Sequence, residues 1–494
     1  MRQEDKRLSD LGLTATRGRD VTVTGLSLDS RAVKPGHLFA ALPGSARHGA
    51  DFITYALRMG ATAILTDRAG VALAADALGG SDAALVVAED PRAALAHASA
   101  LWFGAQPDCV VAVTGTNGKT SVASFTRQIW AAMGLAAVNI GTTGVEGAFA
   151  APGLHTTPDP LTLHRVLAAM AADGVTHVAM EASSHGLDQR RMEAVRLAAA
   201  AWTNLTQDHL DYHHTMEAYF AAKLRLFTEL LADDGTAVVN MDDPYGDAVT
   251  AACVAREIEV ITLAQYADDA RLKITGRRLD EGGQDVLFRW QGRQYQARLD
   301  LIGGFQAMNA LTAAGLVIAG GEDPDAVFAV LPKLTGVRGR MQLAARRRSG
   351  APVYVDYSHT PAAVETALKA LRPHVLGRLI IVLGAGGDRD RGKRPLMGKA
   401  AAEFADVVIV TDDNPRWEDP ASIRAAVMAG CPEATEVGDR AEAILRAVDA
   451  LQPGDALLIA GKGHETGQTV GDTVYPFDDV EQASIAVAAL EGLL

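Results

Sequence analysis

A short glycine-rich segment constrains the fold of this chain more than any other feature. Gly115-Thr-Asn-Gly-Lys-Thr-Ser121 follows the apolar run 109–114 and precedes a helical stretch over residues 120–133. A short apolar run that ends at a glycine is typical of a buried parallel strand. A strand, a glycine-rich turn and the start of a helix, in this order, form the setting of a phosphate-binding loop.

The residue types in this loop fit that interpretation. Backbone N–H groups of such a turn, and those of the helix N-terminus, point at phosphate oxygens. Lys119 adds a positive charge, and the Thr120 hydroxyl can bind Mg²⁺. The spacing between Gly115 and Gly118 is shorter than in the usual pattern. The alternative is an ordinary turn followed by a helix cap.

The rest of the chain predicts an α/β fold. Apolar runs alternate with helical stretches around the loop, which indicates a central doubly wound sheet of the P-loop ATPase type. Residues 271–302 break this rhythm with short runs separated by Gly292, which favour antiparallel hairpins, and residues 305–319 return to helix. Four later apolar runs predict a second, Rossmann-like open sheet: 353–356, 379–383, 407–411 and 456–460.

The length of 494 residues fits about three domains. We expect a smaller N-terminal α/β domain over residues 1–105, a central domain over 106–336 and a C-terminal domain over 337–494.

Composition narrows the function classes. The net charge is 46 − 60 = −14, and an acidic surface repels phosphate backbones, so we expect no nucleic-acid partner. The three cysteines are far apart and never in CxxC spacing, which fits a reducing cytoplasm and neither a disulfide scaffold nor a zinc site. The chain shows no signal peptide and no apolar segment long enough to span a membrane. We expect a cytoplasmic monomer.

Two later segments carry groups suited to metal binding. Glu181 ends an apolar run, and a carboxylate at the carboxyl end of a strand beside a phosphate loop is well placed to hold Mg²⁺. A solubilising carboxylate is the alternative. The segment 204–213 is rich in polar and imidazole groups, and its His209 is either a ligand of a second metal or an ordinary loop histidine.

Taken together, these segments resemble the Mur ligase family, the ATP-dependent enzymes that add amino acids to the UDP-N-acetylmuramoyl peptide of bacterial cell walls. The resemblance covers all three predicted domains and is strongest for the member that adds the third residue of the peptide. It rests on these segments, in chain order: Asp29-Ser-Arg31, the loop 115–121, Thr156-Thr-Pro-Asp-Pro160, Glu181-Ala-Ser-Ser-His185, Asp208-His-Leu-Asp211, Asp356-Tyr-Ser-His-Thr-Pro361, Gly386-Gly-Asp-Arg-Asp-Arg-Gly-Lys-Arg394, Asp413-Asn-Pro-Arg416 and Gly461-Lys-Gly-His-Glu465.

The resemblance implies an ATP site and two Mg²⁺ sites. Thr120 and Glu181 would hold one Mg²⁺, and His209 with Lys223 carbamylated by CO₂ would hold the other. A carbamate is an anionic oxygen ligand that suits Mg²⁺, whereas an ammonium is repelled by it; without the resemblance, Lys223 is an ordinary surface lysine. Lys119, Lys223, His209 and Glu181 would be the catalytic residues. ATP would contact Gly115, Thr116, Asn117, Gly118, Lys119, Thr120, Ser121, Asn309, Arg340 and His359.

The same resemblance implies the site of the UDP-muramoyl-dipeptide. Its residues would be Ser30, Thr156, Thr157, Ser183, Gln189 and Arg191. Hydroxyls and a guanidinium suit pyrophosphate and carboxylate acceptors. The chain departs from the family at Gln306, where Asn is usual before the adenine-contacting Asn309, and at Ser358, where Ala is common.

The family divides between L-lysine and meso-2,6-diaminopimelate as the added amino acid. Diaminopimelate carries one more carboxylate, which the planar guanidinium of Arg416 can bind in a bidentate manner. A site built for a polar group can reject an analogue that lacks it by ~10⁴–10⁵-fold. We therefore predict diaminopimelate, with L-lysine as the alternative. The expected contacts are Arg389, Asp413, Asn414, Arg416, Gly461 and Glu465.

The implied reaction is ATP-dependent amide formation through an acyl phosphate on the D-glutamate γ-carboxylate. It would serve peptidoglycan precursor synthesis, and with it cell shape and cell division. The alternatives are another Mur ligase, a folylpolyglutamate synthase, or a P-loop switch or scaffold that binds nucleotide without joining two substrates. The last class leaves Arg416, Glu465 and the Thr156–Thr157 pair without a purpose.

Overall fold

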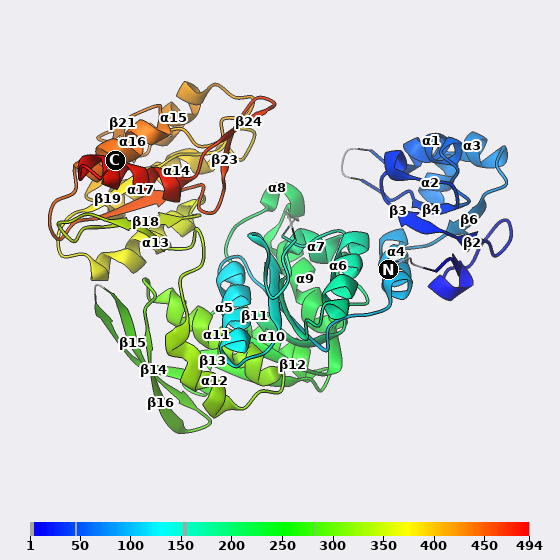
Figure 1. Cartoon of the computed structure of the whole chain (residues 1–494), viewed down its shortest axis with the longest axis horizontal. Helices are drawn as coiled ribbons and strands as arrows, with labels where there is room; N and C mark the ends of the chain where they lie inside the picture. Colours follow the sequence, from blue (N-terminus) through cyan, green and yellow to red (C-terminus); the bar gives the residue numbers. More distant parts are fainter. Residues whose placement is uncertain (1–3, 45–46, 152–155, 281, 494) are drawn as a thin grey trace.

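The computed structural model describes residues 4–44, 47–151, 156–280 and 282–493, so the first residues of the predicted N-terminal domain, 1–3, lie outside it. The chain forms three bodies, with the first and the third on opposite sides of the central one (Figure 1). Each of the three large sheets lies within one of the three predicted segments.

The central body is built on a ten-stranded sheet in the order β16-β15-β14-β13-β12-β11-β7-β10-β8-β9. Strands β7, β8 and β10–β14 pair in parallel with their neighbours, whereas β9, β15 and β16 are added antiparallel. The strands are β7 (Cys109–Thr114), β8 (Ala137–Gly141), β9 (Gly144–Gly147), β10 (His177–Glu181), β11 (Leu197–Trp202), β12 (Leu231–Asn240), β13 (Glu259–Ala264), β14 (Leu272–Asp280), β15 (Gly283–Trp290) and β16 (Arg293–Leu299).

Helices cover both faces of this sheet. Helices α5 and α11 pack together on one face, and the apolar side chains of α6 and α9 fill the core on the other. The helices are α5 (Lys119–Ala132), α6 (Pro160–Ala172), α7 (Ser184–Asp188), α8 (Leu210–His213), α9 (Met216–Arg225) with a π-helical turn over Leu226–Leu230, α10 (Gly246–Val254), α11 (Phe305–Ala319) and α12 (Pro324–Val330).

The N-terminal body has a parallel four-stranded sheet in the order β3-β4-β5-β6. Its strands are β3 (Gly25–Ser27), β4 (His37–Ala40), β5 (Ala63–Thr66) and β6 (Ala84–Val87), next to a small antiparallel pair, β1 (Lys6–Arg7) and β2 (Thr22–Val23). Its helices are α1 (Ile53–Arg58), α2 (Arg68–Leu73), α3 (Ala75–Gly79) and α4 (Pro91–Phe103).

The C-terminal body has a six-stranded sheet in the order β17-β18-β22-β19-β20-β21, parallel except for β17, and a separate hairpin. The strands are β17 (Gln342–Arg346), β18 (Pro352–Asp356), β19 (Leu379–Leu383), β20 (Val407–Val410), β21 (Thr435–Glu436), β22 (Ala456–Ala460), β23 (Gly467–Val470) and β24 (Thr473–Pro476). The helices are α13 (Pro361–Leu371), α14 (Lys393–Phe404), α15 (Pro420–Met428), α16 (Arg440–Asp449) and α17 (Asp479–Leu490).

The antiparallel extension of the central sheet also supports the C-terminal body. The His374 ring lies between the Asp280 carbonyl, 2.5 Å from Nδ1, and the Gly303 N–H, 3.4 Å from Nε2. Since the carbonyl only accepts, Nδ1 carries the proton and Nε2 accepts from Gly303. The sequence predicted hairpins here, but their junction with the central sheet was not predicted.

The observed architecture confirms the predicted α/β class with its central doubly wound sheet and second open sheet. Cys109, Cys253 and Cys431 are buried free thiols. Among the residues that the structure describes, no helix is long and apolar enough to cross a bilayer.

A fully buried ion pair holds the C-terminal body together. The Arg440 guanidinium bonds to both Asp479 carboxylate oxygens at 2.7 Å, and it also donates to the carbonyls of Asp412 and Ala460. Removal of one partner leaves a buried charge without compensation, which costs about 3–5 kcal/mol.

We expect Asp479→Ala to lower the melting temperature of the C-terminal body strongly, measured by calorimetry. The exposed Asp449→Ala, on α16, is the matched control and should leave it unchanged. Equal melting temperatures for both variants would show that the ion pair contributes no stability.

Candidate active site

Parallel pairing brings the candidate catalytic segments to one edge of the central sheet. Strand β7 lies between β10 and β11, and all three run in the same direction. Their carboxyl ends therefore lie side by side, and these ends carry the loop 115–121, Glu181 and Thr203. In open α/β sheets this edge is where ligands bind.

The glycine-rich loop packs tightly against α11. Gly118 has φ of +90°, a conformation that favours glycine. A Cβ atom at this position would lie 2.7 Å from Asn309 Oδ1, so no larger residue fits. The amide of Asn309 donates to Gln306 Oε1 at 3.0 Å. The departure from the family at Gln306 thus supplies a side chain that fixes the orientation of Asn309.

Two lysines, Lys119 half-buried and Lys223 buried, hold the backbone of this loop. Lys119 Nζ donates to the carbonyls of Gly115 at 2.9 Å and Thr116 at 2.8 Å, and Lys223 Nζ donates to Gly115 at 2.7 Å. Lys223 is only 1% exposed, so the alternative of an ordinary surface lysine is wrong. Burial lowers the pKa of both lysines; Lys223 falls well below its usual value, with the charge of Lys119 adding to the effect.

Glu181 is a buried carboxylate at the end of β10. Its two oxygens accept from the Thr142 N–H at 2.7 Å and from the Thr142 hydroxyl at 3.2 Å. The same hydroxyl lies 3.1 Å from the Thr156 hydroxyl. Thr142 therefore fixes the carboxylate and connects it to the predicted dipeptide site, a role that no sequence motif indicated.

His209 lies in a cluster of aromatic rings that precedes α9. Its ring meets that of His185 edge-on at 4.9 Å, and Nε2 lies 3.4 Å from Asp208 Oδ2. The residue adopts a φ of +53°. The His209 side chain, 45% exposed, thus rests against the His185 ring and Asp208.

A cavity of about 450 Å³ separates the central body from the C-terminal body. The loop residues 116–121 and Asn309 line it from the central side, and Arg340 and His359 line it from the other. Arg340 bridges the two sides, because its guanidinium donates to the Thr120 hydroxyl at 3.2 Å. Burial lowers the pKa of His359. Of the predicted ATP contacts, all but Gly115 line this cavity.

The predicted metal ligands Thr120, Glu181, His209 and Lys223 line the same cavity. Within the described part of the chain, no three His, Cys, Asp or Glu side chains converge as a ready-made metal site. A buried carboxylate and a hydroxyl beside a phosphate loop nevertheless fit Mg²⁺, which takes few protein ligands and completes its shell with water and substrate phosphates.

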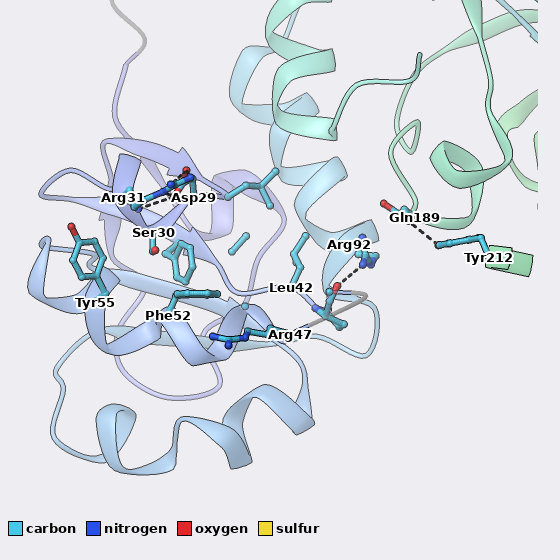
Figure 2. Close-up of a pocket in the computed structure, with 16 residues that line it drawn as sticks. Asp29, Ser30, Arg31, Leu42, Arg47, Phe52, Tyr55, Arg92, Gln189 and Tyr212 are labelled. Atoms are coloured by element: carbon cyan, nitrogen blue, oxygen red, sulfur yellow. Dashed lines mark hydrogen bonds and ion pairs between the residues drawn. The ribbon is translucent and has the colours of Figure 1, made fainter. Parts of the chain in front are cut away.

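The predicted dipeptide residues lie along a path between two cavities. Ser30 and Gln189 line a second cavity of about 1100 Å³ at the N-terminal body (Figure 2). Thr156 and Ser183 line the first cavity. Arg191 joins the two ends, since it donates to Gln189 Oε1 at 2.7 Å and to the Thr157 carbonyl at 2.8 Å.

The predicted amino-acid contacts form a separate group at the carboxyl edge of the C-terminal sheet. Arg389 and Arg416 both pass close to Gly386, whose Cβ position would lie 2.9 Å from Arg416 Nη1 and 3.8 Å from Arg389 Cγ. Arg416 donates to the Gly387 carbonyl at 2.7 Å. In the described ranges neither guanidinium has an acidic partner within 4.0 Å, so the pair can receive an anion.

A buried lysine that sequence reasoning did not assign organises the rest of this group. Lys462 is fully buried and donates to Asn414 Oδ1 at 3.2 Å, to Glu465 Oε2 at 3.1 Å and to the Gly467 carbonyl at 2.5 Å. The Asn414 amide also donates to Glu465 Oε2, at 2.8 Å. Nearby, Gly461 approaches Asp413 so closely that a Cβ would lie 2.5 Å from Oδ2. Lys462 lies within the Gly461–Glu465 segment of the family resemblance, so that segment could have pointed to it.

A phosphate-type loop on a doubly wound sheet, facing a second sheet domain across a cavity, defines a multidomain α/β nucleotide-binding protein. Family models match most of the chain: the Mur ligase family catalytic domain over residues 22–102, the Mur ligase middle domain over 113–317 and the Mur ligase glutamate ligase domain over 339–463. The chain belongs to the Mur ligase family, as the sequence predicted.

Curated relatives are similar over nearly their full length. UDP-N-acetylmuramoyl-L-alanyl-D-glutamate–2,6-diaminopimelate ligase of Bradyrhizobium diazoefficiens is 50% identical over 470 residues, which cover 94% of this chain and 95% of the relative. The enzyme of the same name from Caulobacter vibrioides is 49% identical over 496 residues, covering 99% of both.

Solved structures agree with the fold. A structure of a UDP-N-acetylmuramoyl-L-alanyl-D-glutamate–2,6-diaminopimelate ligase matches with a TM-score of 0.72 and 33% identity, covering 99% of this chain and 100% of that one. A Mycobacterium tuberculosis folylpolyglutamate synthase complexed with ADP and AMPPCP matches with a TM-score of 0.60 and 21% identity, covering 78% and 91%. The second similarity shows a shared fold only.

A substitution at Gly141, at the end of β8, tests the position of Glu181. A Cβ atom there would lie 2.1 Å from Glu181 Oε1, so Gly141→Ala must displace the carboxylate. We expect a destabilisation of about 1–3 kcal/mol in chemical denaturation, together with a loss of ligase activity. Gly79→Ala, where nothing lies within 4 Å, is the matched control. If both variants behave like wild type, Glu181 does not rest against β8.

Proposed function

We propose that this chain is an ATP-dependent ligase that adds meso-2,6-diaminopimelate to the D-glutamate γ-carboxylate of UDP-N-acetylmuramoyl-L-alanyl-D-glutamate. The observation that carries the proposal is the pair Arg389 and Arg416, two guanidiniums without acidic partners among the described side chains, at the same sheet edge as Asn414 and its partner Glu465. A substrate with both carboxylate and ammonium groups complements this set. The names of the full-length relatives support the same reaction.

ATP would bind in the cavity between the central and C-terminal bodies. The loop amides and Lys119 would receive its phosphates, Asn309 its adenine, and Arg340 and His359 would reach it from the C-terminal side. Thr120, Glu181, His209 and carbamylated Lys223 would hold Mg²⁺. When bound, Mg²⁺ neutralises charge on the transferring phosphoryl group.

The reaction would have two steps. An oxygen of the D-glutamyl γ-carboxylate attacks the γ-phosphorus of ATP. The bond between this phosphorus and the β-phosphate oxygen breaks, ADP departs, and the substrate becomes an acyl phosphate. The neutral amine of diaminopimelate then attacks the acyl carbon, inorganic phosphate departs with the bonding electrons, and the amine loses a proton. Positive groups around the loop stabilise the charge that develops in the first step.

The groups proposed to bind ATP and the added amino acid lie on two different bodies, so the reaction needs both. The loop and Glu181 belong to the central body, whereas Arg340 and the amino-acid contacts belong to the C-terminal one. The bridge from Arg340 to Thr120 joins them across the cavity. Closure of this kind excludes water, which would hydrolyse an acyl phosphate.

The dipeptide substrate would extend from Ser30 past Gln189 and Arg191 to Thr157 and Ser183. In this proposal residues 1–105, 106–336 and 337–494 correspond to the nucleotide-substrate, ATP and amino-acid domains. The protein would act as a cytoplasmic monomer in peptidoglycan precursor synthesis.

Arg416 should decide which amino acid is added. We expect the wild-type protein, given ATP and the UDP-muramoyl-dipeptide, to add diaminopimelate and not L-lysine, with the product identified by mass spectrometry. Arg416→Met should reduce kcat/KM for diaminopimelate by at least about 30-fold, because it removes a charged contact to the distal carboxylate. Arg446→Met, which removes an exposed arginine, is the control. Addition of lysine alone would contradict the assignment.

The proposed carbamate at Lys223 makes a separate prediction. Because burial lowers the pKa of Lys223, its neutral amine is available to react with CO₂, and ¹³C-bicarbonate should give a carbamate resonance in NMR. We expect Lys223→Ala to lose that resonance and to lower turnover by about 10³-fold or more, with partial rescue by a short carboxylate. Lys369→Ala, at an exposed lysine, should change neither. Full activity of Lys223→Ala would exclude the role.

A further inference from the structure

The second cavity contains residues from two bodies. Its walls come mainly from the N-terminal body, with Ser30, Phe52 and Tyr55 at one end, while Gln189 and Tyr212 come from the central body. Figure 2 shows Gln189 and Tyr212 together on the side of the cavity away from Tyr55, with Arg92 between the two groups. The cavity therefore reaches the junction where the predicted dipeptide path begins.

The hydroxyl of Tyr212 fixes the Gln189 side chain. Arginine only donates, so the Gln189 atom that faces Arg191 at 2.7 Å is its oxygen. Its nitrogen then donates to the Tyr212 hydroxyl at 3.1 Å, and that hydroxyl donates to Asp188 Oδ2 at 2.7 Å. The direction of each of these three hydrogen bonds is thus determined, from Arg191 through Gln189 and Tyr212 to Asp188.

Two guanidiniums at this junction lack an acidic partner. Arg92 donates to the Pro43 carbonyl, and Arg191 donates to Gln189 and the Thr157 carbonyl. Within the described ranges neither has a carboxylate within 4.0 Å. Adjacent Arg190, by contrast, pairs with three acidic side chains: Asp90, Glu193 and Glu229.

The two unpaired cations also influence each other. Burial lowers the pKa of Arg191, Asp159 opposes this, and the positive charge of Arg92 lowers it further. Asp159 caps α6 by accepting from the Thr162 N–H at 3.0 Å. Arg92 lines the second cavity, and Arg191 lies behind Gln189, which lines it too. Asp159 offsets part of the charge of Arg191, whereas Arg92 has no ion-pair partner among the described residues, so this part of the cavity favours an anionic ligand.

We propose that Arg92 and Tyr212 complete the binding site of the UDP-muramoyl-dipeptide at the junction of the N-terminal and central bodies. Arg92, together with Arg191, binds anionic oxygens of this substrate, and Tyr212 is a positioning residue that orients Gln189 and, through it, Arg191. The assignment rests on the proposed function. The anionic oxygens come either from the pyrophosphate or from the glutamyl carboxylates, which a binding experiment separates.

The first experiment measures the KM of each of the three substrates for Arg92→Met and Tyr212→Phe. Arg92→Met loses hydrogen bonds to a charged group and should raise the KM of the UDP-muramoyl-dipeptide roughly 10–100-fold. Tyr212→Phe loses one neutral hydroxyl and should raise it roughly 3–10-fold. The KM values of ATP and diaminopimelate and the melting temperature should stay unchanged. A merely structural role would change all of these quantities together.

Matched controls are available on the surface. Arg68→Met, at an exposed arginine on α2, and Tyr266→Phe, at a tyrosine that is 75% exposed, should leave every KM unchanged.

Calorimetric binding of UDP alone and of the UDP-muramoyl-dipeptide identifies the anion. If Arg92→Met weakens both, Arg92 binds the pyrophosphate; if it weakens only the complete substrate, Arg92 binds a carboxylate. Unchanged affinity for both overturns the role of Arg92.

A double-variant cycle tests how Tyr212 acts. If its hydroxyl works through Gln189, then Tyr212→Phe should cause no further loss of affinity in a Gln189→Ala background. Additive losses would overturn the positioning role.

The two proposals fail in distinguishable ways. A wild-type protein that binds the UDP-muramoyl-dipeptide but forms no product contradicts the ligase function, and the calorimetric comparison still tests Arg92 and Tyr212. A wild-type protein that forms product, with variants that bind substrate equally well, contradicts only the further inference.

Discussion

The tight contact between the glycine-rich loop and its supports is the constraint on which the site depends. The carbonyl of Gly115 receives hydrogen bonds from two lysines, the half-buried Lys119 and the buried Lys223. Gly118 leaves no space for a side chain against Asn309. Since these supports come from α5, α9 and α11, three helices distant in the sequence must pack correctly before the loop has its shape. The site is therefore a product of the whole central core.

The amino-acid end of the site is organised in the same manner by buried cations. Arg440 holds the carbonyls of Asp412 and Ala460, the residues just before Asp413 and Gly461. Lys462 donates hydrogen bonds to both Asn414 and Glu465. Each cation has enough hydrogen-bond acceptors to offset the cost of burial. Loops at a sheet edge thus gain fixed positions without extensive apolar packing of their own.

The sequence predicted the parts of this protein that local patterns specify. The strand before the loop, the helix over 305–319 and four of the six sheet strands of the C-terminal body follow from apolar runs and from glycines that end them. The edge strands β17 and β21 were not predicted. The family resemblance supplied the candidate site residues, and the relatives' names agree with diaminopimelate rather than lysine.

What the sequence did not predict depends on contacts between distant segments. Thr142 carries no motif, yet its hydroxyl and N–H both hold Glu181. The burial of Lys223 follows from the packing of α9 against the loop, so its helical pattern alone suggested a surface residue. Likewise, the addition of β14–β16 to the central sheet depends on pairing with β13, which no local signal specifies.

The distribution of charge has a consequence for substrate encounter. The chain as a whole carries a charge of −14, while the unpaired guanidiniums Arg92, Arg191, Arg389 and Arg416 lie at its junctions and sheet edges. Within about one Debye length of the acidic surface a polyanionic nucleotide is repelled, whereas farther away the charge is screened, and it is attracted only where it approaches these guanidiniums. Moderate salt would therefore ease the approach of the nucleotide substrate even as it weakens the final ionic contacts. Selection of the substrate would then depend on short-range contacts with these guanidiniums rather than on long-range electrostatic attraction.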